Sequence, residues 1–275
     1  MTKLDPLFPR LGGKTKLKKR LITYFPKGYE DMIYVEPFIG GGSLYFLKKP
    51  SKKLEIINDL DIDIYNIYQD IQNVPADDIK KFSFEEANVG DFKEYMNQKT
   101  FSSRTERLYR NLYLSYNSFA GMRTSFNHNR VTNFYKATKL KKIDDYKKRM
   151  RNTIILNMGY DKIMNCLKNN PDVLFYLDPP YFISGIKHYK EEHMDYKLFF
   201  NLVCTVKGKV IVSLNEHKDI LNYATTGPCT KKLYIYKEEV KYTTGAYAKK
   251  GIKIVNEYIM TNYRVPGKVY INKIE

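Results

Sequence analysis

Short runs of hydrophobic residues recur along the chain and alternate with segments in which apolar residues lie three and four positions apart. The first pattern predicts buried strands and the second predicts amphipathic helices. Strands are expected at residues 32–35, 54–58, 153–156, 173–177, 210–214, 232–236 and 255–263, and helices at 14–25, 62–71, 160–167, 195–206 and 217–223. This alternation predicts an α/β fold with a mixed, mostly parallel sheet and helices on both faces.

The alternation stops between residues 74 and 150. Helical patterns cover residues 84–96 and 104–114, and the rest of this stretch is polar, basic and aromatic without strand periodicity. We therefore expect residues 1–73 and 151–275 to form one domain, and residues 74–150 to form a helical insertion within it.

The chain is strongly basic, because its 275 residues carry a formal net charge of +17. Such an excess indicates a polyanionic partner, most simply nucleic acid, although an AT-rich genome that favours lysine codons would also contribute. Basic side chains cluster in residues 10–20 and again in residues 136–151. Phosphate contact is the role expected of the second cluster, with an ordinary solvated face as the alternative.

The cysteines and histidines show no metal-ligand spacing. Cys166, Cys204 and Cys229 lie far apart in the sequence, which predicts free thiols in a reducing compartment. The sequence contains no His-Glu-x-x-His pattern, so a zinc site is not expected. No apolar stretch is long enough to span a bilayer, and the start of the chain lacks an apolar signal core. We therefore expect a soluble, intracellular protein without a metal or a membrane partner.

A short motif, Asp178-Pro179-Pro180-Tyr181, follows the apolar run at residues 173–177. Ligands of open α/β sheets bind at the carboxyl ends of the strands, and two consecutive prolines hold the backbone stiffly while removing two donors. A carboxylate, a rigid carbonyl and an aromatic ring together suit a planar heterocyclic amine. A simple strand-ending turn is the alternative.

A glycine run, Gly40-Gly41-Gly42, lies shortly after the first predicted strand. Consecutive glycines between a strand and a helix allow the backbone to approach a ligand closely, but this run fits neither the dinucleotide fingerprint nor a phosphate loop. Asp59 ends the second strand, where an acid commonly binds ribose hydroxyls or caps the next helix.

Four motifs, taken in order, resemble those of Dam-like, D12 class DNA adenine methyltransferases. They are Gly12-Gly13-Lys14, the run 35–42, Asp59-Leu60-Asp61 and the run 178–181; residues 257–263 are similar to the strand that closes the catalytic domain of that family. The resemblance spans nearly the whole chain. It implies a Rossmann-like, S-adenosylmethionine-dependent methyltransferase fold with an inserted helical target-recognition domain.

The resemblance also implies methyl transfer from S-adenosylmethionine to the exocyclic N6 of adenine in double-stranded DNA. Asp178 and the Pro179 carbonyl would accept the two amino hydrogens, Pro180 would help to keep the motif rigid, and Tyr181 would stack on a base that has left the duplex. Cofactor contacts are implied for Lys14, Glu36, Pro37, Phe38, Gly40, Gly42, Asp59 and Asp178.

The reading loop of the family falls within residues 116–130, where Asn, Arg and Ser side chains can read base edges, or simply build a polar loop. This chain departs from its relatives in the loop at Ala120, before the glycine pair at Arg10, and at Gly159, where relatives carry an acid near the adenine of the cofactor. DNA contacts are expected from Arg10, Lys14, Asn117, Ser118, Arg123, Asn127, Arg130, Lys141, Lys142 and Tyr189.

Three alternatives stay open at this point. Amino methyltransferases that act on RNA or on a protein glutamine more often carry Asn in place of Asp178 and lack an insertion. Cytosine N4 enzymes more often carry Ser or Thr there, and a catalytically silent DNA-binding homologue would bind DNA tightly but the cofactor weakly. We expect a monomer or weak dimer, and a place in a restriction-modification system.

Overall fold

The computed structural model describes residues 4–10, 17–84, 86–128, 139–182, 194–242 and 253–272. The chain forms two compact units. We call them the helical unit, made of Met1–Lys14, Ile39–Pro50 and Ile57–Asn157, and the sheet unit, made of Thr15–Phe38, Ser51–Ile56 and Met158–Glu275. The expected insertion, residues 74–150, lies wholly within the helical unit, although the exact domain boundaries stay a prediction.

Seven strands form one sheet in the order β3-β2-β1-β4-β5-β7-β6. β1, β4 and β5 are parallel neighbours, whereas β7 runs antiparallel to both β5 and β6. The predicted mixed α/β sheet is therefore confirmed. The strands are β1 (Ile33–Glu36), β2 (Glu55–Asn58), β3 (Thr153–Leu156), β4 (Val173–Leu177), β5 (Lys209–Asn215), β6 (Tyr234–Tyr242) and β7 (Lys253–Thr261).

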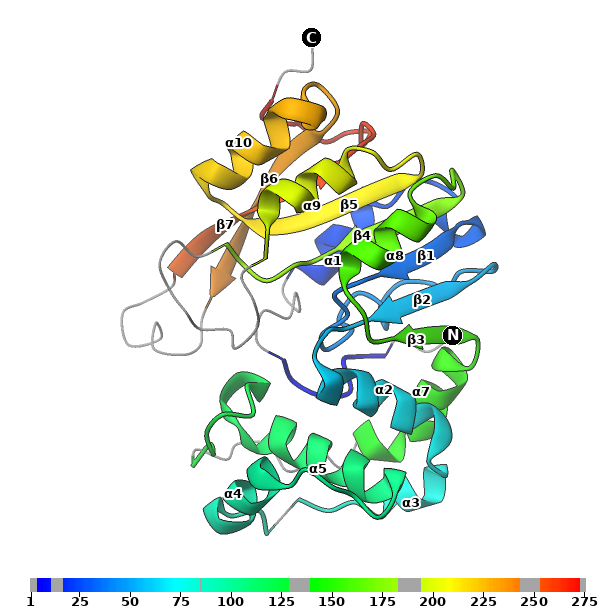
Figure 1. Cartoon of the computed structure of the whole chain (residues 1–275), viewed down its shortest axis with the longest axis vertical. Coiled ribbons are helices and arrows are strands. Elements are labelled where there is room, and N and C mark those ends of the chain that lie inside the picture. The colour runs from blue at the N-terminus through cyan, green and yellow to red at the C-terminus, as the bar shows by residue number, and fades with distance from the viewer. Residues whose placement is uncertain are drawn as a thin grey trace. The chain divides into compact units, whose positions relative to one another are not determined.

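The sheet unit packs helices against its central strands. β4 is buried along its whole length, as its unbroken apolar run predicts. Helices α8, α9 and α10 lie side by side in front of β4 and β5, and α1 lies behind these strands (Figure 1). The bounds are α1 (Lys18–Leu21), η1 (Ile22–Tyr24), η2 (Tyr29–Asp31), α8 (Tyr160–Leu167), α9 (Tyr196–Val203), α10 (Lys218–Thr225) and η4 (Gly227–Cys229).

Two expectations for the sheet unit need correction. The helix expected at residues 14–25 is, over its described part, a short α-helix followed by a 3-10 turn, and Tyr24 in that turn packs edge-on against Tyr236 of β6. The sixth strand is longer than expected, because it pairs with β7 as far as Tyr242. The second half of this strand is largely polar and did not predict a strand from the sequence. Its pairing with β7 sets the length of the strand.

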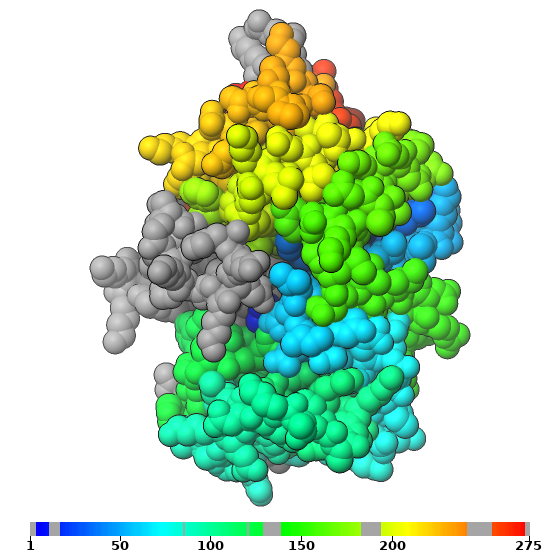
Figure 2. Space-filling view, viewed as in Figure 1, coloured from blue at the N-terminus to red at the C-terminus, as the bar shows by residue number. Residues whose placement is uncertain are grey.

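The helical unit is built around α2, which packs against α5 and α7, with α4 against α5. In the space-filling view the side chains of α4 and α5, in teal and green, form a closely packed surface (Figure 2). The helices are α2 (Ile62–Asn73), α3 (Ala76–Lys80), α4 (Val89–Asn97), α5 (Arg104–Asn117), η3 (Phe119–Gly121) and α7 (Ile143–Met150).

Side-chain caps set where these helices begin. The Asn88 side chain accepts a hydrogen bond from the backbone N–H of Asp91 at 2.9 Å, so α4 begins at Val89 and the prediction of a helix from residue 84 was too long. Ser103 caps α5 in the same way through the N–H of Glu106, which places the start of that helix where the sequence predicted it.

Cys204 and Cys229 form a disulfide, with their Cα atoms 5.2 Å apart. The prediction of free thiols is therefore wrong for these two residues, while Cys166 is free and exposed. Packing of α9 against η4 brings the two sulfurs together across 25 residues of sequence, a spacing that carries no pairing signal.

Within the described ranges, no helix is both long and apolar enough to cross a membrane. In the same ranges, no three His, Cys, Asp or Glu side chains gather as metal ligands would.

Candidate active site

The Asp178 carboxylate lies directly after β4 and is held by a side chain of the neighbouring strand. The hydroxyl of Ser213 on β5 donates to Asp178 Oδ1 at 3.0 Å, and Ser213 Oγ lies 2.9 Å from the hydroxyl of Tyr176. Because Ser213 gives its single hydroxyl proton to Asp178, its oxygen accepts from Tyr176. Burial, and then the charge of Asp178, raise the pKa of Tyr176 well above its usual range, so this hydroxyl keeps its proton. The relay fixes the orientation of the carboxylate.

The rest of the Asp178–Phe182 segment is also held from outside. The hydroxyl of Tyr196, at the start of α9, donates to the carbonyl of Pro180. The hydroxyl of Tyr181 donates to Glu257 on β7 at 2.6 Å, and the side chain of Asn215 bonds the backbone of Phe182. The four residues predicted to be catalytic therefore form one stiffly held segment at the carboxyl end of β4.

Three of the predicted cofactor residues lie at the end of β1 in the same unit. Glu36 is buried and accepts a hydrogen bond from the hydroxyl of Tyr34 at 2.6 Å. The half-buried ring of Phe38 packs against Tyr160 of α8, with centroids 5.4 Å apart, and Pro37 between Glu36 and Phe38 is buried. Phe38 thus presents an apolar ring at the end of β1, and its contact with a cofactor stays a prediction, whereas Glu36 is engaged within the unit.

The glycine run and Asp59 come together in the helical unit. The backbone N–H of Gly40 donates to Asp59 Oδ2 at 2.8 Å, and the N–H of Asp61 donates to Oδ1 at 3.0 Å. The hydroxyl of Tyr68 on α2 donates to the carbonyl of Gly40 at 2.9 Å. Gly42 has φ of +70° and passes so close to Tyr68 that a Cβ atom would lie 2.7 Å from its hydroxyl oxygen. Only glycine suits that position.

Burial raises the pKa of Asp59 to about 6, although the two backbone N–H groups oppose the shift. Desolvation penalises the charged carboxylate, while hydrogen bonds to that form favour it. The group therefore changes its charge within a pH range that an assay can reach.

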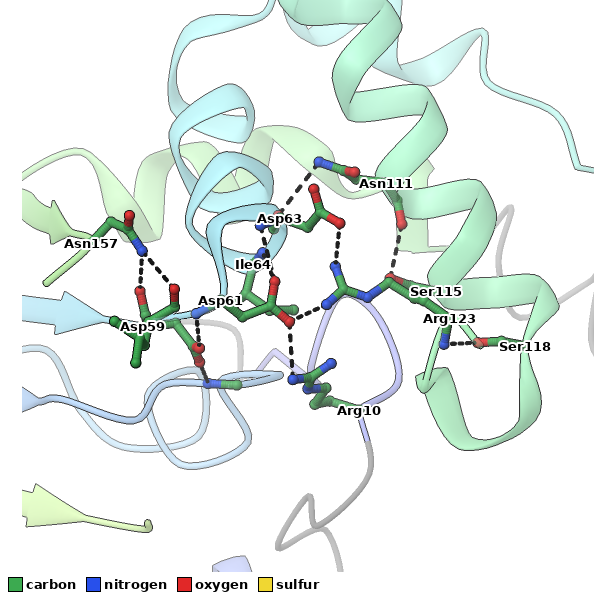
Figure 3. A network of polar contacts seen from close by, with 12 residues as sticks. Arg10, Asp59, Asp61, Asp63, Ile64, Asn111, Ser115, Ser118, Arg123 and Asn157 are labelled. Carbon is green, nitrogen blue, oxygen red and sulfur yellow. Dashed lines mark hydrogen bonds and ion pairs between the residues drawn. The ribbon is translucent and has the colours of Figure 1, made fainter. Parts of the chain in front are cut away.

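Asp61 binds two of the arginines that the sequence assigned to DNA. Its Oδ2 atom lies 3.1 Å from Arg10 Nη2 and also accepts a hydrogen bond from Arg123, whose second nitrogen lies 3.3 Å from Asp63 (Figure 3). Arg110 of α5 adds a third guanidinium, 2.9 Å from Asp63. Asp61 also caps α2 by accepting from the N–H of Asp63. These five residues form the aspartate–arginine cluster.

The segment between Asn117 and Asn127 is a closed loop within the helical unit. The N–H of Asn127 donates to the carbonyl of Asn117 at 2.8 Å, and Ser118 pairs with Phe126 as an isolated bridge. The Ser118 hydroxyl accepts from the N–H of Arg123, whose φ is +60°. The Asn117 and Ser118 side chains are buried and shape this loop. Their direct contact with DNA stays a prediction.

The second basic cluster divides into exposed and engaged lysines. Lys141, Lys142 and Lys148 are exposed. Lys147, in contrast, donates from Nζ to the carbonyls of Ile71, Gln72 and Val74 at 2.7 to 2.9 Å, where α2 ends, and burial lowers its pKa. Among the predicted site residues, Lys14, Arg130 and Tyr189 lie outside the described residues.

Sequence reasoning missed the side chains that support the motif, namely Ser213, Asn215 and Tyr196, and gave Glu257 no role of its own. Ser213 and Asn215 are polar positions that interrupt and end the apolar run beginning at Val210 of β5, and Glu257 is an acid buried on β7. Such interruptions of a buried strand are a usable signal, because a buried polar group must find a partner.

The chain is similar to known methyltransferases over most of its length. The family model of the D12 class N6 adenine-specific DNA methyltransferases matches residues 11–258. The Type II methyltransferase M1.LlaDCHI of Lactococcus lactis subsp. cremoris is 28% identical over 94% of this chain and 96% of its own length.

Solved structures show weaker likenesses. An rRNA methylase of Streptococcus thermophilus has 11% identity and a TM-score of 0.36 over 91% of this chain and 96% of its own. The rRNA methyltransferase aviRa of Streptomyces viridochromogenes has 9% identity and a TM-score of 0.34 over 94% and 88%. Neither structural likeness carries the assignment.

The family match covers most of the chain, so this protein belongs to the D12 class N6 adenine-specific DNA methyltransferases. It is a DNA adenine methyltransferase with a Rossmann-like fold, and the family assignment made from the four motifs is confirmed.

Proposed function

We propose that this protein transfers a methyl group from S-adenosylmethionine to N6 of an adenine that has left the DNA duplex. The observation that carries the proposal is the Asp178 carboxylate, which Ser213 holds at the carboxyl end of β4, directly before two prolines. S-adenosylmethionine, when bound, supplies an electrophilic methyl group. Asp178 and the carbonyl of Pro179 hold the adenine amino group in the reactive orientation.

The amino nitrogen of adenine is a poor nucleophile, because its lone pair is delocalised into the ring. Asp178 accepts a hydrogen bond from one N–H of the amino group, and the carbonyl of Pro179 accepts a hydrogen bond from the other. The nitrogen therefore becomes pyramidal and its lone pair becomes available. Tyr181 stacks on the base after extrusion from the duplex. The relay from Tyr176 through Ser213 holds the Asp178 carboxylate in place, so little reorganisation precedes the reaction.

Residues of the first two strand ends suit a nucleoside cofactor. A carboxylate has about four acceptor positions, and backbone N–H groups occupy two of those on Asp59, so ribose hydroxyls can take the others. Phe38 offers an apolar ring, and the tightly packed glycine run lets the backbone approach the ligand. Lys14, Glu36 and Pro37 are further candidates for cofactor contact.

Double-stranded DNA is the proposed macromolecular substrate. The exposed Lys141 and Lys142 supply positive charge for phosphates, and the loop between Asn117 and Asn127 supplies side chains for base edges. The name of the Lactococcus relative further supports a place in a restriction-modification system.

The test uses unmethylated duplex DNA and isotopically labelled S-adenosylmethionine, followed by digestion to nucleosides and mass spectrometry. Label is expected in N6-methyladenine and is expected to disappear with Asp178→Ala, while DNA binding is retained. Asp172→Ala is the matched control, because Asp172 is an exposed aspartate just before the opposite end of the same strand. Label in cytosine, or equal activity of Asp178→Ala, would overturn the proposal.

A further inference from the structure

The hydroxyl of Tyr181, the aromatic residue of the catalytic motif, donates a hydrogen bond to Glu257 Oε1 at 2.6 Å. Glu257 lies on β7 and its side chain is fully buried. A buried carboxylate costs free energy unless hydrogen bonds compensate for its lost hydration, so an apolar residue would be the cheaper choice on this strand. The position therefore calls for a role beyond packing.

Asn215, at the end of β5, holds the residue that directly follows the motif. Its Oδ1 atom accepts from the backbone N–H of Phe182, and its Nδ2 atom donates to the carbonyl of Phe182, both at 2.9 Å. Asn215 and Glu257 are direct partners in the antiparallel pairing of β5 with β7. One cross-strand pair thus holds the last residue of the motif by its side chain and the next residue by its backbone.

This support replaces what the backbone cannot supply. The pairing of β4 with β5 ends at Leu177 and Val212, so Tyr181 and Phe182 lie beyond the sheet ladder. The two prolines before them have no N–H to donate. The hydrogen bond from Tyr181 to Glu257 and the two backbone bonds between Asn215 and Phe182 therefore restrain the Tyr181 ring and the stacking surface that it presents.

We propose that Glu257 is a positioning residue that fixes the plane of the Tyr181 ring for stacking on the target adenine, with Asn215 holding the backbone beneath it. This inference rests on the proposed function, because it assigns Tyr181 to the extruded base. Glu257 acts on the base through Tyr181. Its acceptor oxygen is the essential feature, so an amide at this position retains most of the function.

The experiment is a double-mutant cycle on Tyr181→Phe and Glu257→Leu, measured by kcat and KM on unmethylated plasmid DNA with labelled S-adenosylmethionine. Each single variant removes the same hydrogen bond and is expected to lower kcat about tenfold, with KM for DNA and cofactor nearly unchanged. The double variant is expected to be no slower than the slower single variant. Glu257→Gln is expected to restore most of the rate.

Thr261→Val is the matched control, because Thr261 is also a fully buried polar residue of β7 but bonds only locally, to the carbonyl of Tyr263. It is expected to lower the melting temperature without changing kcat. Thermal unfolding of all variants reports the Tyr181–Glu257 bond independently of activity, since coupled losses of stability reveal the bond even where no methylation is measured.

The outcomes separate the two proposals. If the wild-type protein does not methylate adenine, the proposed function fails, and the positioning role fails with it even where unfolding shows the bond. If the wild-type protein is active but the kcat losses are additive, or Tyr181→Phe keeps full activity, the positioning role is overturned and the proposed function stands. Coupled losses in kcat with rescue by Glu257→Gln support both.

Discussion

The carboxylate of Asp59 accepts a hydrogen bond from the backbone N–H of Gly40, with 2.8 Å between the two heavy atoms. The acid that ends one strand therefore holds the glycine run that follows another. Because burial raises the pKa of Asp59 to about 6, this contact and any ribose contact made by the same group depend on pH near neutrality.

Affinity for S-adenosylmethionine is expected to weaken as the pH falls through about 6. Protonation of Asp59 removes acceptor capacity, so the dissociation constant should rise by up to about tenfold for each pH unit below that value. Calorimetric titration between pH 5 and 8 measures this. Asp59→Asn should bind weakly and show little pH dependence over this range; an unchanged pH profile in that variant would assign the effect to another group.

The same carboxyl links folding to pH. Its pKa in the folded protein lies above the ordinary value of 3.8, so the folded state binds the proton more tightly than the unfolded chain. The contribution of Asp59 to the free energy of unfolding therefore decreases as the pH rises from about 4 to about 6. Comparing the unfolding free energies of wild type and Asp59→Asn across this range isolates the contribution.

Replacing Asp61 with Asn is expected to separate its two roles. Asn retains the cap on α2, but it loses the charge that binds Arg10 and Arg123. We expect the free energy of unfolding to fall by about 2 kcal/mol. The released arginines should strengthen DNA binding at low salt and steepen its salt dependence, while methylation becomes less selective for sequence.

Fluorescence anisotropy at several salt concentrations, together with sequencing of the methylated positions, measures these effects. Asp61→Ala is the control, because it removes the cap as well and should cost about a further 1 kcal/mol. An Asp61→Asn protein with unchanged stability and unchanged salt dependence would show that the ion pairs carry no free energy.

Gly42→Ala is expected to damage the glycine run. The new Cβ atom would lie 2.7 Å from the hydroxyl oxygen of Tyr68 at a φ of +70°, so steric conflict adds to backbone strain. We expect about 3 kcal/mol of lost stability and weaker cofactor binding. Gly28→Ala, at a similar φ of +77° but with nothing within 4 Å, should lose only about 1 kcal/mol. Equal losses in thermal unfolding would exclude the steric explanation.

The exposed and engaged lysines of the second basic cluster should behave differently. Replacing Lys141, Lys142 and Lys148 together with Gln is expected to weaken DNA binding and to reduce the slope of log affinity against log salt by up to about 3. Lys147→Met should leave that slope unchanged, because Lys147 is engaged within the protein. It should lower the melting temperature, because three carbonyls at the end of α2 lose their hydrogen-bond donor. The reverse pattern would place the phosphate contact on Lys147.

The strands and the motif residues could be predicted because their signals are local. An unbroken apolar run marked β4, and the residues directly after it had to lie at the carboxyl edge of the sheet. Asp59 was found for the same reason, as the acid that ends β2. The strand at residues 255–263 was also expected, but its antiparallel pairing and the role of Glu257 were not.

The contacts that hold the site join residues far apart in sequence, and no local pattern encodes them. In the sequence, Ser213 is a polar residue next to an apolar run and gives no sign of its partner. The parallel pairing of β4 with β5 places it beside Asp178. Arg10 and Arg123 had the charge of phosphate ligands, yet the fold gave them Asp61 as a partner. Hydrophobic periodicity thus determined the fold class from the sequence itself, and strand-end chemistry placed the Asp178-Pro179-Pro180-Tyr181 motif at the edge of the sheet, while its catalytic role stays a prediction. Only the tertiary structure decided which buried polar side chains bind one another and so compensate for their lost hydration, because that pairing depends on distance in space.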